Sequence, residues 1–354
     1  MARDPVAGST PRGDGSGVPV GEGSDALRVG AVSVAEFGRP GLLSYTLTRR
    51  SARLQRLLAE RHVALLHAHF GVEGTYAAPL ARGLRIPLVT TLHGFDVTLS
   101  RARLFRSGRI SWVNYAIWRD DLLETGASFV CVSEYVRRCA LEWGYPDDRL
   151  VVLPIGVDVD LIRPAPVVER PRILHVARLV EVKGTADLLR AFAVVRRAVP
   201  DAELVLIGAG PLREQLAALA AELGLGDSVR FLGALPYAET LEWMGRSRLL
   251  CLPSVTAATG AREGLGMVLL EAAALGRPVV GTEHGGIPEA VTDGVNGFLV
   301  AEHDVGGLAE RLLALLRDQD LSARLGRAGR EMVVERFDLR RQTAKLEALY
   351  RSLL

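Results

Sequence analysis

The stretch from residue 262 to residue 300 limits the possible folds more than any other part of the chain. It reads REGLGMVLLEAAALGRPVVGTEHGGIPEAVTDGVNGFLV. The segment GMVLLEAAALG is apolar on nearly every side and predicts a buried helix, and PVVGT predicts a short buried strand. A glycine turn precedes this helix, and a second one, GGIPEA, opens another. Buried helices and strands joined by such turns are typical of a parallel α/β sheet.

The glycine turn before the first of these helices predicts an anion site. Free backbone N–H groups and the positive end of the helix dipole favour a diphosphate there. Glu271, about a turn inside the helix, can accept hydrogen bonds from ribose hydroxyls, as acidic residues do in dinucleotide folds. Glu263 lies on the loop before the helix and is free to meet another part of the ligand. The stretch therefore predicts a crevice for a nucleotide diphosphate.

Strand–helix alternation extends over the whole chain from Leu27. Apolar runs predict strands over 27–34, 63–70 and 87–97, and 47–60 predicts one amphipathic helix. This alternation implies parallel doubly wound sheets, in which ligands gather at the carboxyl ends of the strands. Polar side chains follow the predicted strands of the first half at those ends: His67, His69, His93, Asp96 and Ser133.

Length and composition indicate a globular protein of two domains. The 354 residues are 49% hydrophobic and 24% charged, and we place the domains at 27–165 and 166–339. Residues 1–26 are rich in Gly, Pro, Ser and Asp and lack an apolar signal-peptide core, which predicts a disordered tail. A net charge of +2 argues against nucleic acid as a partner. Isolated cysteines and no apolar run of membrane-spanning length favour the cytoplasm.

The spacing Glu263-x7-Glu271, followed by GRPVV, GGIPE and DGVNGFLV, resembles the retaining glycosyltransferases of family 4. The motifs HAHFG, TLHGFDV, VSEYVRR, LPIGVD, VARLVEVKG, LIGAGPL and FLGAL fall in the order of that family, so the resemblance covers about 63–354. It implies a GT-B fold, in which two Rossmann-like doubly wound parallel-sheet domains face each other across a cleft. It also implies that the helix over 340–354 packs back onto the first domain.

The resemblance assigns roles to individual residues. Positions matching Arg178 and Lys183 hold the donor diphosphate, as two cations can without a metal or another cofactor. Glu263 matches the glutamate that contacts the sugar, Glu271 the ribose-binding glutamate, and His93 a histidine near the reaction centre. Backbone donors to the nucleotide sugar come from Gly264, Leu265, Gly266 and Met267. The turn at Gly208 and Gly210 is assigned to the donor side, and His67, His69, Asp96 and Ser133 to the acceptor side.

The start of the chain departs from the family pattern. About 40 residues separate Leu27 from His67, so one βαβ piece and its glycine-rich loop are missing from the pattern. The first domain is therefore predicted to be short. The expected reaction moves a sugar from a UDP- or GDP-sugar to a saccharide or lipid-linked acceptor in exopolysaccharide biosynthesis. A secondary-metabolite glycosyltransferase, a GT-B sugar-nucleotide epimerase and a catalytically impaired remnant stay open as alternatives. The histidines together with Asp96 also have the residue types of a metal site, but the resemblance implies none, because GT-B enzymes generally need no bound cation.

A segment between Arg101 and Arg119 has five arginines and no acidic residue. Four aromatic residues alternate with the arginines: Phe105, Trp112, Tyr115 and Trp118. Arginine and aromatic side chains together suit a lipid interface, where rings lie at headgroup depth and cations meet anionic lipid. The sequence thus predicts peripheral contact with the inner face of the cell membrane. The alternative is that the aromatic rings are buried and the arginines form a solvated rim around the acceptor cleft.

Overall fold

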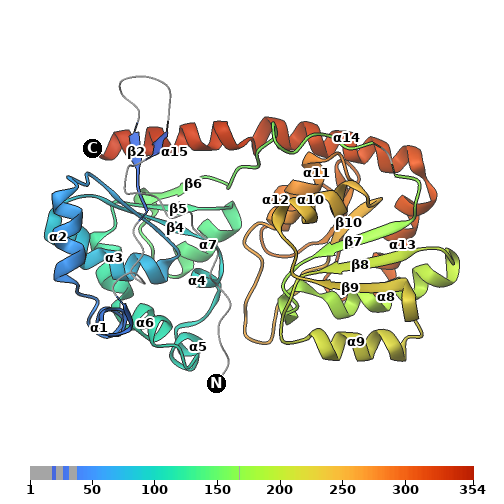
Figure 1. The fold of residues 1–354 in the computed structure, drawn as a ribbon, viewed down its shortest axis with the longest axis horizontal. Helices are drawn as coiled ribbons and strands as arrows, with labels where there is room; N and C mark the ends of the chain where they lie inside the picture. The colour runs from blue at the N-terminus through green and yellow to red at the C-terminus, as the bar shows by residue number, and fades with distance from the viewer. Residues whose placement is uncertain (1–17, 21–26, 32–37, 167) are drawn as a thin grey trace.

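The computed structural model describes residues 18–20, 27–31, 38–166 and 168–354. Two α/β halves lie next to each other, and two helices from the end of the chain run along the same side of both (Figure 1). These helices are α14 (Gln319–Arg336) over the second half and α15 (Leu339–Leu353) over the first. Among the described helices, none is both long and apolar enough to cross a lipid bilayer.

The first half is built on a parallel sheet of four strands within the described residues. The strands follow one another in chain order: β3 (Leu66–His69), β4 (Leu88–Leu92), β5 (Ser128–Cys131) and β6 (Leu150–Val152). Every residue of β4 and β5 is buried, as expected for parallel strands covered by helices on both faces. The main helices are α3 (Gly71–Leu84), α6 (Ile110–Thr125) and α7 (Glu134–Glu142).

The second half has a parallel sheet in the order β12-β11-β10-β7-β8-β9 within the described residues. Its strands are β7 (Arg172–Val176), β8 (Glu203–Ile207), β9 (Val229–Gly233), β10 (Leu249–Leu252), β11 (Val279–Thr282) and β12 (Gly297–Val300). Its helices are α8 (Thr185–Ala198), α9 (Arg213–Glu222), α10 (Tyr237–Gly245), α11 (Met267–Ala274), α12 (Ile287–Ala290) and α13 (Val305–Arg317). The strand order reverses between β7 and β10, which is where ligands bind in such sheets.

The N-terminal region differs from the sequence prediction in part. Most of the predicted disordered tail, and residues 32–34 of the first predicted strand, lie outside the described residues. Within the described part, β1 (Val18–Val20) and β2 (Leu27–Val29) pair as an antiparallel ribbon that is separate from both large sheets. The predicted strand over 27–34 thus has strand geometry over Leu27–Val29.

Two sequence predictions about element boundaries are wrong. The single helix predicted over 47–60 is two, α1 (Gly38–Thr48) and α2 (Ala52–Glu60). Arg49 has a φ of 57°, and the Ser51 side chain accepts a hydrogen bond from the Leu54 N–H at 3.1 Å, so a new helix starts there. The strand predicted over 87–97 stops at Leu92, because Gly94, with a φ of 132°, turns the chain into the short helix α4 (Phe95–Thr98).

The last helix lies on the first half. The chain crosses over at Val157, whose N–H donates to the Phe337 carbonyl at 2.7 Å and whose carbonyl accepts from the Leu339 N–H at 3.0 Å. At the far end of α15, the Tyr350 hydroxyl is hydrogen-bonded to Nδ1 of His67 at the end of β3. The C-terminal helix therefore contacts a predicted site residue of the first half directly.

Candidate active site

The loops after β7 and β10 meet at the point where the strand order reverses. The β7 loop carries Arg178 and Lys183, and the β10 loop leads to Glu263. Gly184, with a φ of 63°, lies where the two loops touch, because a Cβ there would lie 1.7 Å from the Pro253 carbonyl oxygen. A glycine is therefore required for the two loops to approach each other this closely.

Lys183 and Glu263 form an ion pair across these loops. The Lys183 Nζ lies 2.5 Å from Oε2 of Glu263, and the Ser254 hydroxyl donates to the same oxygen at 3.2 Å. Both charged side chains are mostly buried, with 22% and 15% of their surfaces exposed. Arg178, on the same β7 loop, is exposed and makes no ion pair with any described residue. The β7 loop thus carries one cation that is paired with a carboxylate, Lys183, and one that has no ion-pair partner among the described residues, Arg178.

Glu271 lies on α11, which starts at Met267 after Gly266, a residue with a φ of 80°. Burial raises the pKa of the Glu271 carboxyl, and a hydrogen bond with Tyr237 opposes that shift. Tyr237 is half exposed, and burial together with the nearby Glu271 raises the pKa of its phenol to about 12. Tyr237 is not among the residues predicted from the sequence, because it comes from the start of α10 and meets Glu271 only through tertiary packing.

Gly208 and Gly210 pack against the β7 loop that carries Arg178. A Cβ at Gly208 would lie 1.8 Å from the Ala177 carbonyl oxygen, and one at Gly210 would lie 2.3 Å from that of Leu179. The glycine turn after β8 therefore packs directly against the backbone on either side of Arg178. The structure explains these two glycines by close backbone packing.

Three histidines and a tyrosine form a row at the carboxyl edge of the first sheet. The His67 ring stacks on that of His69 at 4.7 Å, and Nδ1 of His69 lies 3.1 Å from Nε2 of His93. Burial lowers the pKa of His67 and of His93 to about 4, and partial desolvation also lowers the pKa of the more exposed His69, so all three are neutral at pH 7. Among the described residues, no group of three His, Cys, Asp or Glu side chains is arranged to hold a metal ion.

The sequence prediction placed Asp96 and Ser133 on the acceptor side, but both side chains are buried and cannot face an acceptor. Asp96 is fully buried, and its carboxylate accepts hydrogen bonds from the N–H groups of Gly71, His93 and Gly94 at 2.8–3.3 Å. It therefore shapes the turn that carries His93. Ser133 is also fully buried, and its hydroxyl donates to the Gly264 carbonyl at 2.7 Å. A side chain at a strand end can equally turn inward and bind the backbone.

The two halves are in contact at this edge. Besides Ser133, the Glu289 carboxylate accepts from the N–H groups of Glu134 and Tyr135, both at 2.8 Å, at the N-terminus of α7. A Cβ on Gly264 would lie 2.1 Å from the His93 carbonyl oxygen. The loop with Glu263 therefore lies directly against the turn with His93, which places the residue predicted to contact the sugar next to the one predicted near the reaction centre.

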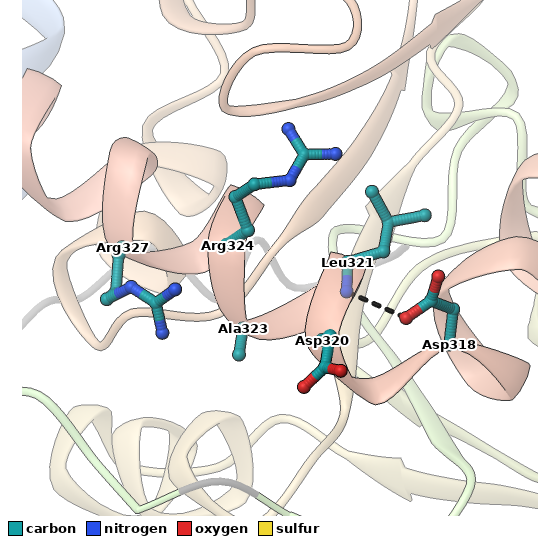
Figure 2. A pocket seen from close by; sticks show the side chains of 6 residues that line it. All are labelled: Asp318, Asp320, Leu321, Ala323, Arg324 and Arg327. Atoms are coloured by element: carbon teal, nitrogen blue, oxygen red, sulfur yellow. Dashed lines mark hydrogen bonds between the residues drawn. The ribbon is translucent and has the colours of Figure 1, made fainter.

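A pocket elsewhere on the second half is not part of this arrangement. The pocket has a volume of about 400 Å³ and lies at the start of α14, and Figure 2 shows the side chains that line it. Its lining consists of Asp318, Asp320, Leu321, Ala323, Arg324 and Arg327. It contains none of the residues singled out by the sequence motifs.

Comparison with known proteins identifies the family. Family models match in two pieces, described as Glycosyltransferase Family 4 over residues 10–161 and Glycosyl transferases group 1 over residues 161–332. The GDP-mannose-dependent alpha-(1-6)-phosphatidylinositol monomannoside mannosyltransferase of Mycolicibacterium smegmatis is 34% identical over 84% of this chain and 79% of its own length. The chain belongs to glycosyltransferase family 4. The predicted resemblance is thus confirmed, and with it the assignment of the protein as a glycosyltransferase.

A further relative supports the family 4 assignment, and a solved structure supports the fold. The amylovoran biosynthesis glycosyltransferase AmsK of Erwinia amylovora is 31% identical over 80% of this chain and 72% of its own length. The crystal structure of HepE from Anabaena in complex with UDP aligns with a TM-score of 0.73 at 24% identity, covering 85% of this chain and 82% of that one. The predicted GT-B architecture is confirmed by this likeness and by the two parallel sheets.

Arg178→Ala is expected to weaken binding of a nucleoside diphosphate about tenfold or more. A hydrogen bond from a charged group to phosphate contributes about 1.5–3 kcal/mol, and Arg178 has no competing acidic partner among the described residues. Calorimetric titration would measure the dissociation constant. Arg190→Ala serves as the control, because Arg190 lies on the outer surface of α8 and pairs with Asp187. Equal affinities of the two variants would contradict the phosphate role of Arg178.

Proposed function

We propose that this family 4 enzyme transfers a sugar, with retention of anomeric configuration, from a GDP- or UDP-sugar to a hydroxyl of a saccharide or lipid-linked acceptor. The observation that supports this most is the Lys183–Glu263 ion pair at the strand-order reversal, beside the exposed Arg178. The two cations suit a diphosphate leaving group, and Glu263 suits the hydroxyls of the attached sugar. GDP-mannose is the first donor to test, because the Mycolicibacterium relative is named as dependent on it.

The proposed reaction takes place on one face of the sugar. The bond from the anomeric carbon to the diphosphate breaks, and a bond to the acceptor oxygen forms on the same side. The acceptor proton passes to an oxygen of the leaving diphosphate. Asp96 is unsuited to act as an inverting base, since its buried carboxylate is bound by backbone N–H groups. Neutral His93, next to the Glu263 loop, would contact the sugar near the reaction centre.

The function is tested by incubating the protein with a panel of sugar nucleotides and simple saccharide acceptors, with and without a metal chelator. We expect transfer that survives chelation, because Arg178 and Lys183 provide the positive charge that a bound cation provides elsewhere. Proton NMR of the first-formed product should show the anomeric configuration of the donor. An inverted product would refute the retaining mechanism, and loss of activity on chelation would refute metal independence.

We assign the reaction to exopolysaccharide biosynthesis. The support is the similarity to AmsK, which is named for amylovoran biosynthesis, and to a colanic acid biosynthesis glycosyltransferase of Escherichia coli that is 32% identical over 81% of this chain. Acceptors in such pathways are often attached to lipids. An acceptor of that kind would require the cleft to lie close to a membrane surface.

Only part of the arginine-rich segment over 101–119 is free to contact a lipid surface, because some of its side chains are buried or bonded within the protein. Tyr115 is fully buried, and Arg103 reaches across to the Ala258 carbonyl of the second half at 2.7 Å. Arg119 pairs with Asp120 at 3.0 Å. An exposed apolar and basic surface remains on α5 (Arg101–Phe105) and α6, next to exposed leucines of α1. Its members are Leu42, Leu43, Leu47, Arg101, Phe105, Arg106, Ile110, Ile117 and Trp118.

We propose that this surface binds anionic lipid. Each cation near such a membrane contributes about 1 kcal/mol, so the double variant Arg101→Glu/Arg106→Glu should lower partitioning to anionic vesicles about 30-fold or more. Sedimentation with vesicles of anionic and zwitterionic lipid at low salt measures this. The control is Arg324→Glu/Arg327→Glu, which reverses two arginines at the pocket in Figure 2. Wild-type protein that stays in the supernatant, or equal loss in both variants, would contradict the proposed site.

A further inference from the structure

His284 and Glu302 form a buried pair directly behind the Glu263 loop. The His284 side chain is completely buried, and its Nδ1 lies 2.8 Å from Oε1 of Glu302. Its Nε2 accepts the backbone N–H of Glu263 at 3.1 Å. Because Nε2 must be the acceptor in that bond, the ring proton is on Nδ1, and this N–H donates a hydrogen bond to Glu302. The imidazole therefore links the Glu302 carboxylate to the main chain of Glu263.

The same carboxylate also holds the other end of the loop. Oε2 of Glu302 accepts the Thr256 N–H at 2.6 Å, and Oε1 accepts the Thr256 hydroxyl at 3.1 Å. Burial alone would raise the pKa of Glu302, but the bonds from His284 and Thr256 outweigh it and lower that pKa. Glu302 is thus held in its charged form with three donors around it. His284 and Glu302 therefore hold both ends of the loop from Thr256 to Glu263 by hydrogen bonds.

The backbone of Glu263 is held from both sides as a result. Its N–H is taken by His284, and its carbonyl accepts the Gly286 N–H at 3.1 Å. Gly285 also packs against it, since a Cβ there would lie 2.2 Å from that carbonyl oxygen. The direction of the Glu263 side chain toward Lys183 follows from this backbone placement.

We propose that His284 and Glu302 are positioning residues for Glu263: they fix its main chain and so aim its carboxylate at Lys183 and the transferred sugar. The inference rests on the proposed role of Glu263 toward that sugar. Neither residue contacts Arg178 or Lys183, the two side chains proposed to bind the diphosphate. Replacing either one should therefore lower kcat and leave nucleotide affinity unchanged. A displacement of about 1 Å in a catalytic group costs on the order of 100-fold in rate.

His284→Asn should lower kcat about 10- to 100-fold and leave the dissociation constant of the nucleoside diphosphate within about threefold of wild type. Glu302→Ala should have the same effect. Glu302→Gln should recover part of the loss, because its amide oxygen can still accept from the imidazole. The matched control is His303→Asn, since His303 is exposed, pairs with Asp187 and has a φ of 64° that asparagine tolerates.

Two further measurements separate a positioning role from a general loss of structure. Combining His284→Asn with Glu302→Ala should cost no more than the larger single loss, since the two act as one unit. Hydrogen exchange of peptides covering 254–266 should be faster in both single variants, and unchanged in His303→Asn. A kcat within twofold of the control, nucleotide affinity that falls in step with kcat, or unchanged exchange in the loop would each overturn the proposal.

Failure of the proposed function would look different. If the wild-type protein transferred no sugar from any donor, the glycosyl-transfer proposal would fail by itself. The exchange comparison needs no turnover, so it would still decide whether His284 and Glu302 hold the loop. If wild type is active and the loop loosens without a change in kcat, the positioning role is wrong and the proposed function stands.

Discussion

Replacing Gly264 by alanine is expected to reduce turnover about 100-fold or more while both domains stay folded. The added methyl group would lie 2.1 Å from the His93 carbonyl oxygen and 3.1 Å from its carbon. Relief of that overlap requires the two halves to separate by roughly 1 Å, which moves Glu263 away from His93. The backbone of Gly264 has no positive φ, so alanine is strained only by this contact.

The control for this variant is Gly245→Ala. A Cβ at Gly245, on α10, would meet the Ala165 Cβ at an ordinary 3.6 Å among the described residues. Steady-state kinetics and thermal unfolding of both variants would distinguish a lost contact between the two halves from a general loss of stability. We expect similar unfolding temperatures and a large difference in kcat. A Gly264→Ala enzyme that keeps a third or more of wild-type kcat would show that contact between the halves at Gly264 is not needed for transfer.

Removing the charge of Glu263 is expected to lower kcat about 100-fold, whereas removing the Glu271 side chain should mainly weaken nucleotide binding. Glu263→Gln loses the ion pair with Lys183 at 2.5 Å, and its predicted partner is the sugar, so free nucleoside diphosphate should bind within about threefold of wild type. Glu271→Ala should weaken that binding about tenfold, the value of a lost bond to a charged group. Calorimetry and initial rates measure the two effects.

Glu222→Gln controls for loss of a carboxylate, because Glu222 is exposed at the end of α9. Its kcat and nucleotide affinity should match those of wild type. If Glu263→Gln and Glu271→Ala lost diphosphate affinity equally, the division of roles between sugar and ribose would be wrong. If Glu263→Gln kept full turnover, the ion pair with Lys183 would be structural.

Particular elements show how far local sequence could go. The runs LVTTL and SFVC are strands because short, mostly apolar or β-branched runs suit a parallel sheet buried on both faces. Ser133 caps α7, because its hydroxyl accepts a hydrogen bond from the Val136 N–H, a local contact that serine favours at a helix start. Local reasoning failed at 47–60, where the apolar spacing continues through a break that Ser51 and the φ of Arg49 create. The periodic spacing of apolar residues does not reveal a break of one turn at which a new helix is capped.

Side-chain direction at the strand ends was also beyond the sequence. Asp96 and Ser133 lie at the predicted edge, yet both turn inward to bind backbone groups. At the same edge, His69 is exposed and lies in hydrogen-bonding distance of His93. The position of a residue after a strand follows from the order of elements. Whether it faces solvent or protein depends on the turn that follows and on what packs against it.

The sequence by itself determined the succession of strands and helices, the glycine turns that precede helix starts, and the family, because these depend on local apolar spacing and on motifs in a fixed order. Only the tertiary structure decided which side chains meet. Lys183 and Glu263 are 80 positions apart and pair because β7 and β10 are neighbours in the sheet. His284 and Glu302 meet behind them for the same reason, since they follow the adjacent strands β11 and β12. The strand order reverses between β7 and β10, so chain order does not reveal that the loops of Lys183 and Glu263 are neighbours.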